Sequence, residues 1–235
     1  MFKKVLFASS VLMTSLVSAD ELSDSNLVTR SLTLKDGEVA LNATLNYGHN
    51  DDDNDVNLGL NGSYGITDNL SIGLGGFRYK FLGRGQNDLG LELAAGAGIK
   101  GFYDVPGPDG ALGYGADLIG KYVLSEQTAF TFSTNYVFWN MPHSSENRDE
   151  WRFSAGVLQT LMDDLTLSAN YEYRVLNDFV DDNTFNVNTA VTYHYSKNWD
   201  FGMYLSYSDF DAVKNGFTSD SSYKENIGLF VNYRF

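Results

Sequence analysis

From residue 38 to the C-terminus, apolar and polar residues alternate with a period of two, in segments of about ten residues joined by polar connections. Successive side chains of a β-strand point to opposite faces, so each segment predicts a strand with one apolar and one polar face. The last segment shows this most clearly, with alternate apolar residues Ile227, Leu229, Val231, Tyr233 and Phe235. A tilted strand of this length crosses a bilayer, and the pattern therefore favours a transmembrane β-barrel.

Aromatic residues at the ends of the apolar faces distinguish this barrel from a soluble β-sandwich, which also alternates. Aromatic side chains prefer the two membrane interfaces and form girdles there. One predicted girdle holds Tyr64, Tyr122, Phe130, Tyr195, Trp199 and Tyr233, and the other holds Tyr47, Phe102, Phe138, Trp151, Tyr173 and Tyr207. The predicted fold class is all-β, an up-and-down antiparallel transmembrane barrel of about 12 strands.

The connections between segments are of two kinds, short turns and long acidic loops. Four three-residue turns are predicted at 67–69, 125–127, 162–164 and 196–198. Short turns face the periplasm in such barrels and long loops face the exterior, which places both termini in the periplasm. The predicted strands span residues 38–48, 56–66, 69–75, 76–82, 89–102, 113–124, 128–140, 150–161, 165–176, 184–195, 199–209 and 223–235.

The stretch 69–82 is the one place where the strand pattern is ambiguous. Its alternation slips at Gly75-Gly76, and a single strand there would put short turns and long loops on the same side of the membrane. We predict a tight hairpin at this Gly-Gly pair. The alternative is a bulge within one long strand, with residues 26–36 as an extra N-terminal strand.

Residues 1–19 have the features of a secretory signal peptide: Lys3 and Lys4, a short apolar run, and a small-residue ending at Ala19. Cleavage after Ala19 removes two lysines and no acidic residue, so the formal charge changes from -14 to -16. This charge argues against nucleic acid as a partner. The absence of cysteine from the sequence excludes disulfides and thiolate sites. Residues 20–37 are predicted to be a periplasmic N-terminal segment, or else to enter the lumen as a small plug.

The C-terminal strand carries a family resemblance. Its alternating apolar residues end in Tyr233-Arg234-Phe235 and resemble the recognition signal of Gram-negative outer-membrane porins, with Tyr233 and Phe235 as the insertion signal. The hairpins at 64–73 and 122–132 also resemble porin hairpins. The resemblance covers residues 38–235 and implies a location in the outer membrane among lipid and lipopolysaccharide. It also implies insertion by the barrel-assembly machinery.

The predicted lumen face is chiefly small, polar and uncharged, with charges of both signs scattered along it. A wall of this kind favours water, and a barrel of twelve strands leaves room for a narrow pore unless large side chains fill it. The pore-lining candidates are Asn42, Asn61, Glu92, Lys100, Asp117, Lys121, Asn135, Arg152, Asn170, Glu172, Arg174, Asn188, His194, Asp200, Lys224 and Arg234.

Two clusters of lumen charges follow from counting residues across the turns. If residue 161 pairs with residue 165, Arg152 faces Arg174, with Glu172 diagonal to Arg152. Counting across 196–198 places His194 opposite Asp200. The first cluster is either a selectivity filter or a structural bridge, and the second pair is interpreted as structural because no nucleophile lies near it.

These features predict a porin-like channel for passive diffusion of ions or small hydrophilic solutes, with no cofactor, no metal and no enzymatic activity. One alternative is a non-conducting structural or adhesive barrel that acts through its acidic loops. A third reading, a surface hydrolase, rests only on His49 and on His143-Ser144 in predicted outer loops. The acidic run 51–55 lacks the glycine and glutamate that an EF-hand loop requires.

Overall fold

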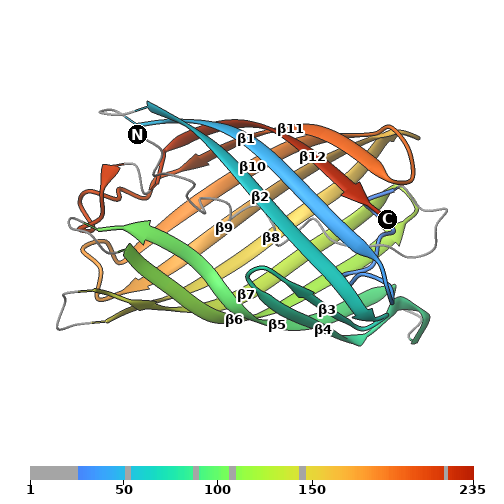
Figure 1. Ribbon diagram of the computed structural model, residues 1–235, viewed down its shortest axis with the longest axis horizontal. Coiled ribbons are helices and arrows are strands. Elements are labelled where there is room, and N and C mark those ends of the chain that lie inside the picture. The colour runs from blue at the N-terminus through green and yellow to red at the C-terminus, as the bar shows by residue number, and fades with distance from the viewer. Residues whose placement is uncertain (1–25, 51–53, 87–89, 106–109, 143–146, 220–221) are drawn as a thin grey trace.

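The computed structural model describes residues 26–50, 54–86, 90–105, 110–142, 147–219 and 222–235. These residues form a closed barrel in which each strand pairs antiparallel with the next and β1 pairs with β12 (Figure 1). Its strands are β1 (Val39–His49), β2 (Asn54–Thr67), β3 (Leu70–Gly73), β4 (Gly76–Leu82), β5 (Leu91–Asp104), β6 (Gly110–Ser125), β7 (Thr128–Asn140), β8 (Arg148–Met162), β9 (Leu165–Asn177), β10 (Asn183–His194), β11 (Trp199–Ser208) and β12 (Glu225–Arg234). The predicted all-β barrel of twelve strands is confirmed.

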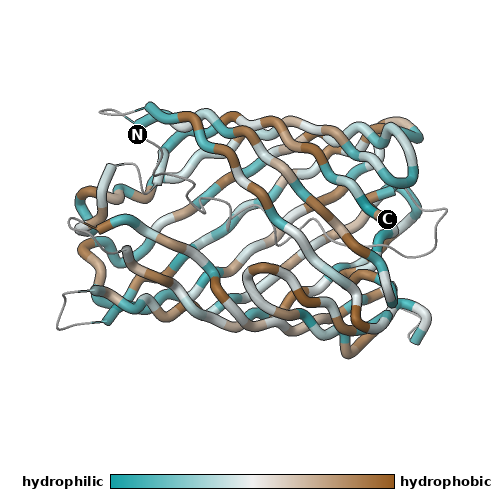
Figure 2. Tube along the Cα trace, viewed as in Figure 1, coloured by the Kyte–Doolittle hydropathy of each residue, from teal (hydrophilic) through white to brown (hydrophobic). Residues whose placement is uncertain are grey.

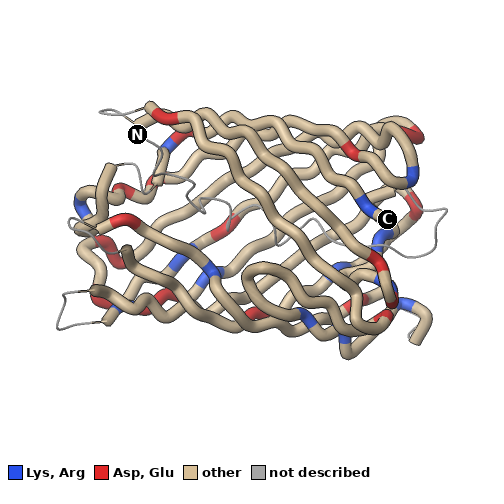
Figure 3. The backbone as a smooth tube through the Cα atoms, viewed as in Figure 1, with Lys and Arg blue, Asp and Glu red and all other residues tan. Residues whose placement is uncertain are grey.

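The alternation in the sequence has become an apolar outside and a polar inside. Apolar and polar residues alternate along each tilted strand (Figure 2), and the outward aromatic residues include Tyr47 at 46% exposure and Trp199 at 39%. Charged residues gather mainly at the two ends of the barrel (Figure 3). Among the described residues, no helix is long and apolar enough to span a membrane.

The two ends of the barrel differ. One end, here called the turn end, holds the short connections β2–β3, β6–β7, β8–β9 and β10–β11. It also holds the longer β4–β5 connection, which contains the 3-10 helix η1 (Arg84–Gln86). Val39 and Phe235 also lie there and exchange backbone hydrogen bonds of 2.8 and 3.0 Å. The opposite end, the loop end, holds the connections β1–β2, β5–β6, β7–β8, β9–β10 and β11–β12, of which the last, residues 209–224, is the longest.

Three of the four predicted short turns are tighter than predicted, and the fourth, predicted at 196–198, spans residues 195–198. Three of the connections have two residues instead of three, because Thr67, Ser125 and Met162 remain in their strands. Each is accompanied by a register shift, at 65/67, 123/125 and 160/162. A β-bulge absorbs one extra residue, which explains why the pairing further along β8 and β9 still has the predicted register.

The predicted split of stretch 69–82 is confirmed, although the turn lies one residue earlier than expected. Gly73 pairs with Gly76, and the two-residue turn is Leu74-Gly75. The alternative with one long strand is wrong, since residues 26–36 form no strand. This hairpin is much shorter than its neighbours, and its tip ends partway along the barrel wall (Figure 1).

The N-terminal residues are described only in part. The predicted signal peptide, residues 1–19, lies outside the described residues, as do residues 20–25. Residues 27–34 include seven buried side chains and lie within the barrel. The sequence left two locations open for residues 20–37, the periplasm or the lumen. Residues 27–34 of this segment, seven of them buried, lie in the lumen.

Candidate functional site: the barrel lumen

The predicted lumen residues occupy the inward positions of their strands, where they alternate with exposed apolar neighbours. Ten of them are buried: Glu92, Asp117, Lys121, Asn135, Arg152, Glu172, Arg174, His194, Asp200 and Arg234. Five are half-buried: Asn42, Asn61, Lys100, Asn170 and Asn188. Lys224 is an exception, because β12 begins at Glu225 and Lys224 lies in the connection before it.

Residues 26–34 fill the lumen at the turn end and are here called the turn-end plug. Lys121 reaches in from β6 and donates from Nζ to the carbonyl oxygens of Leu27 at 2.7 Å and Arg30 at 2.6 Å. Lys80 donates to the Ser31 hydroxyl at 2.7 Å. Backbone groups of a chain that enters a lumen have left bulk water, and Lys121 satisfies two of their carbonyl oxygens.

Apolar side chains of the plug add a second kind of contact. Val28 packs with Ala129 and Leu158, and Leu32 forms a cluster with Ala94 and Ile119. Ala94 and Ala129 are small inward residues, which leaves space for the plug against the wall. The plug is therefore held by packing as well as by polar contacts.

A buried carboxylate, Asp200, connects the plug to the wall. The Arg30 guanidinium donates to both of its oxygens, at 2.8 and 2.9 Å, and Arg234 donates at 2.9 Å. His194 Nδ1 lies 2.7 Å from Asp200 Oδ1, and its Nε2 lies 2.9 Å from the hydroxyl of Thr166. The predicted pairing of His194 with Asp200 is confirmed. The sequence analysis missed the Thr166 hydroxyl beside His194. Thr166 and Asp200 are 0% exposed and His194 is 6% exposed, so all three groups are enclosed between the wall and the plug, which favours a structural role.

The second predicted charge cluster lies toward the loop end. Arg152 pairs with Arg174, as the register predicted, and Glu172 pairs with Ser154, diagonal to Arg152. Glu150, which the sequence analysis did not single out, is the fully buried centre of this cluster. It shares the parity of Arg152 in β8, which is the signal that would have identified it.

Glu150 binds three neighbours through its two carboxylate oxygens. Oε1 accepts from Arg152 at 2.5 and 3.0 Å and from Trp139 at 3.0 Å, and Oε2 accepts from Arg174 at 2.6 Å. Arg174 also donates to the Tyr103 hydroxyl at 3.1 Å. Two guanidinium groups repel unless a carboxylate separates them, so Glu150 allows Arg152 and Arg174 to face each other.

An aromatic cluster closes the lumen at the loop end. Phe210 and Phe217 from the β11–β12 connection are 1% and 2% exposed, and both lie against Tyr103, which stacks on Trp139 at 4.4 Å. The Arg174 guanidinium lies 4.8 Å from the Phe210 ring centroid. This connection was predicted as an outer loop, and its inward fold was not foreseen from the sequence. The cluster is here called the loop-end lid.

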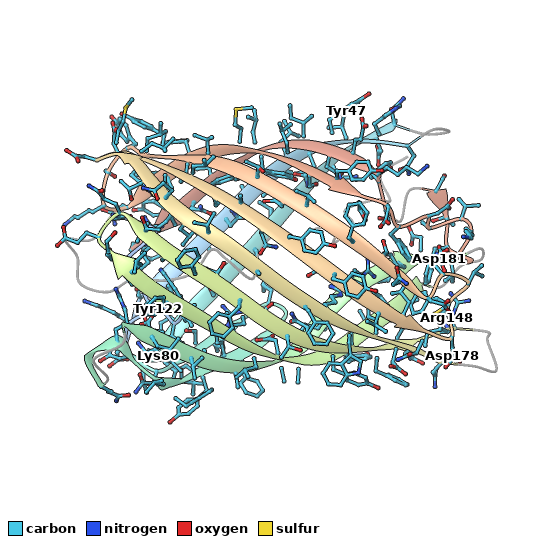
Figure 4. The ribbon with its side chains drawn as sticks, turned by 180° about the vertical axis from the view of Figure 1, so that it is seen from behind. Tyr47, Lys80, Tyr122, Arg148, Asp178 and Asp181 are labelled. Carbon is cyan, nitrogen blue, oxygen red and sulfur yellow. The ribbon has the colours of Figure 1, made fainter. Side chains whose placement is uncertain are left out.

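Arg148 ties the lid to the rim of the barrel. Its guanidinium lies over the rings of Phe179 and Phe217, at 5.1 and 5.4 Å. Arg148, Asp178 and Asp181 lie together at this rim (Figure 4), where Lys214 of the lid pairs with Asp181. The hydrogen bond from Lys214 lowers the pKa of Asp181 below its ordinary value.

Between the two closures the wall is lined by half-buried amides. Asn42 donates to Asn232 at 2.5 Å, and Asn61, Asn170 and Asn188 are also half-buried. Tyr204 and Phe230 take part of the space, since they lie over glycines 228 and 202 in place of side chains there. The sequence analysis considered large side chains as a possible filling of the lumen, and these two are 3% and 4% exposed.

The residues behind the hydrolase interpretation form no catalytic arrangement in the described part of the chain. His49 Nδ1 lies 2.5 Å from the side-chain oxygen of Asn54, at the loop end. His143 and Ser144 lie outside the described residues, as do residues 51–53 of the acidic run. No group of three or more His, Asp or Glu side chains suited to a metal is found among the described residues.

Solved structures share this architecture at low sequence identity. The NanC porin superposes with a TM-score of 0.55 and 11% identity, over 82% of this chain and 98% of that chain. This is the fold of an outer-membrane β-barrel. OmpT of Vibrio cholerae, folded in vitro, superposes on this outer-membrane barrel with a TM-score of 0.49 and 13% identity, over 85% of this chain and 97% of that chain.

The KdgM porin gives a TM-score of 0.48 at 12% identity, over 83% of this outer-membrane barrel and 99% of that chain. No protein-family model and no curated protein sequence matches the chain. At 11% identity the likeness to the NanC porin establishes the fold alone, and the function has to be argued from the lumen.

Proposed function

We propose that this protein is an outer-membrane channel through which ions or small hydrophilic solutes diffuse passively, and that the turn-end plug and the loop-end lid close it at rest. The observation that supports the proposal is the polar lining in the middle of the lumen. Its wall is made of half-buried amides such as Asn42 and Asn170, which keep accessible surface between two filled ends. In a barrel with a fully packed interior, polar groups that remain accessible to water would add no packing stability, so these amides favour a water-filled lumen.

The proposal gives the barrel an orientation and a set of partners. The turn end, with Phe235, faces the periplasm, and the acidic connections of the loop end face the exterior beside lipopolysaccharide. Tyr233 and Phe235 serve as the signal for the barrel-assembly machinery. The channel needs no cofactor, acts on no substrate chemically and binds no nucleic acid.

The contacts of the plug suit a closure that can be released. Asp200 keeps His194 and Arg234 as partners when Arg30 departs, so the wall does not acquire an isolated buried charge. The barrel strands pair with each other, and the plug, which forms no strand, is held by side chains of the wall rather than by strand pairing. Loss of the plug contacts therefore opens the turn end while the barrel stays intact.

Single-channel recording in planar bilayers tests the proposal. The mature protein is compared with Arg30→Gln, which removes the ion pair to Asp200, and with Lys35→Gln, which removes the same charge beyond the buried part of the plug. A hydrogen bond between charged groups contributes about 1.5–3 kcal/mol, so Arg30→Gln should raise the open fraction at least about tenfold. Lys35→Gln should match the mature protein.

The outcomes separate the parts of the proposal. Equal opening of all three proteins would reject closure by the plug but retain a channel. The reversal potential under a salt gradient then gives the ion preference, for which the acidic charge favours cations. Silence of all three proteins, when each is folded and heat-modifiable, would reject the channel.

A second candidate is a non-conducting structural or adhesive barrel. The specific observation in its favour is that described chain segments fill both ends of the lumen, through the plug and through the loop-end lid. Persistent silence of Arg30→Gln favours this candidate. Loss of cell-surface attachment after neutralisation of Asp178 and Asp181 would then support adhesion through the acidic rim.

A further inference from the structure

The wall of the barrel is incomplete on one side, above the short β3–β4 hairpin. The hairpin ends where Leu74 N donates to Gly62 O at 3.2 Å and Ile99 N donates to Gly75 O at 2.6 Å. Toward the loop end from this level, β2 pairs only with β1 and β5 pairs only with β6 among the described residues. Figure 1 shows the hairpin tip partway along the wall, with β2 and β5 diverging beyond it.

The spacing of the missing strands sets the width of this opening. Three strand spacings separate β2 from β5 at the hairpin, which amounts to about 14 Å between the two backbones. An extended alkyl chain is much narrower than this. The opening is therefore wide enough for a single-chain amphiphile.

Along the opening, no strand among the described residues pairs with the outer side of the β2 backbone. The backbone groups of Gly65 in β2 form hydrogen bonds with Gly37 and Glu38, which precede β1. The carbonyl oxygen of Gly62 accepts a hydrogen bond from the hairpin on the other side of β2. Because the direction of the backbone groups alternates along a strand, Val56, Leu58 and Leu60 direct theirs into the opening. The Val56 N–H donates to the Asp55 side chain at 2.8 Å, whereas no strand pairs with Leu58 and Leu60 on this side among the described residues. Their apolar side chains point to the membrane and are 58–61% exposed. Unpaired backbone groups are costly in hydrocarbon, which favours water from the lumen within the opening.

Charged groups of the lumen lie behind the hairpin. Lys100 is the first residue of β5 beyond the hairpin tip, and it pairs with Asp117. Arg78 of β4 reaches toward the same carboxylate across Gly96, where a Cβ would lie 2.9 Å from Asp117 Oδ1. Arg78 Nε and Asp117 Oδ1 have no hydrogen-bond partner among the described residues. Two cations against one carboxylate leave a positive excess.

We propose that the barrel opens sideways to the bilayer between β2 and β5, and that this opening binds an amphiphile with a single alkyl chain and a carboxylate head group. The chain lies along Val56, Leu58 and Leu60, and the head group pairs with Arg78 and Lys100 inside the lumen. The plug and the lid fill the two axial exits, so the side opening is the route by which such a molecule reaches the middle of the lumen. This site is additional to the proposed diffusion of hydrophilic solutes.

Spin labels on the outer face test whether the opening exists. The chain has no cysteine, and Leu58 and Leu229 form a matched pair of positions. Both are 58% exposed and both pair directly with Leu45, from opposite sides of β1. Only Leu58 borders the opening, because β12 is paired on both sides.

In bilayers, a nitroxide at Leu58→Cys should be several-fold more accessible to a water-soluble nickel chelate than one at Leu229→Cys. Oxygen, which partitions into lipid, serves as the reference for depth. Equal accessibility of the two labels overturns the opening. This comparison leaves every charged residue of the lumen in place.

Binding of dodecanoate to the protein in phosphatidylcholine nanodiscs tests the head-group site. Arg78→Gln should weaken binding about tenfold, because one charge-assisted contact is lost. Lys197→Gln removes the same charge from an exposed turn and should bind as the unsubstituted protein does. Dodecyltrimethylammonium, with the same chain and a cationic head, should bind more weakly than dodecanoate. Equal affinity for the two amphiphiles, or no loss in Arg78→Gln, overturns the proposal.

Discussion

Replacement of Glu150 by glutamine should strongly destabilise the barrel, because this carboxylate is the fully buried partner of two guanidinium groups. Glutamine keeps one acceptor oxygen, so it can retain the bond from Trp139 but cannot neutralise Arg152 and Arg174. Removing one partner of a buried ion pair costs about 3–5 kcal/mol. Glu172 remains nearby and offsets part of the loss, so we expect about 3 kcal/mol.

Urea unfolding of the mature protein in lipid vesicles, followed by tryptophan emission, measures this loss. Trp139 lies in the cluster and reports on it directly. The control is Asp149→Asn, the same change of acid to amide one residue earlier, where the carboxylate accepts an exposed hydrogen bond from Asn177 at 2.7 Å. This control should change the unfolding free energy by less than about 0.5 kcal/mol. Equal effects of the two variants would refute the role given to Glu150.

Three further predictions concern packing, assembly and pH. Gly202→Ala should destabilise the barrel by about 1–3 kcal/mol in the same urea assay, since the new Cβ would lie 2.1 Å from the Phe230 ring; an unchanged midpoint would contradict this. Phe235→Ala should reduce assembly into the outer membrane in cells while refolding in vitro is unaffected, because the side chain is 59% exposed; equal loss in both settings would indicate a structural role. The Lys214 hydrogen bond lowers the pKa of Asp181 from 3.8, so its stabilisation of the lid is complete above that pH and disappears as the pH falls through the lowered value. Pepsin cleavage within residues 209–219 should therefore increase with acidification, and Asp181→Asn should abolish this pH dependence.

Much of the fold was predictable because membrane strands carry a strong two-residue period and their turns fix the register. The pairs Arg152–Arg174 and His194–Asp200 followed from counting across turns alone. The hairpin at 69–82 followed from topology, since strands must cross the membrane in alternate directions. The exact turn residues and strand ends differed, at three of the turns because bulges beside them absorb one residue.

The contents of the lumen could not be predicted in the same way. Arg30 lies 170 residues from Asp200 in the sequence, and Phe210 belongs to a connection with no alternation. The positions of such segments depend on which charges and cavities the closed wall presents to them, and no local pattern encodes that. The sequence by itself therefore determined the barrel, its strand number and the faces of its strands. Only the tertiary structure decided that chain segments fill both ends of the lumen and that the wall stays incomplete beside β2, because these follow from contacts between residues far apart in the chain.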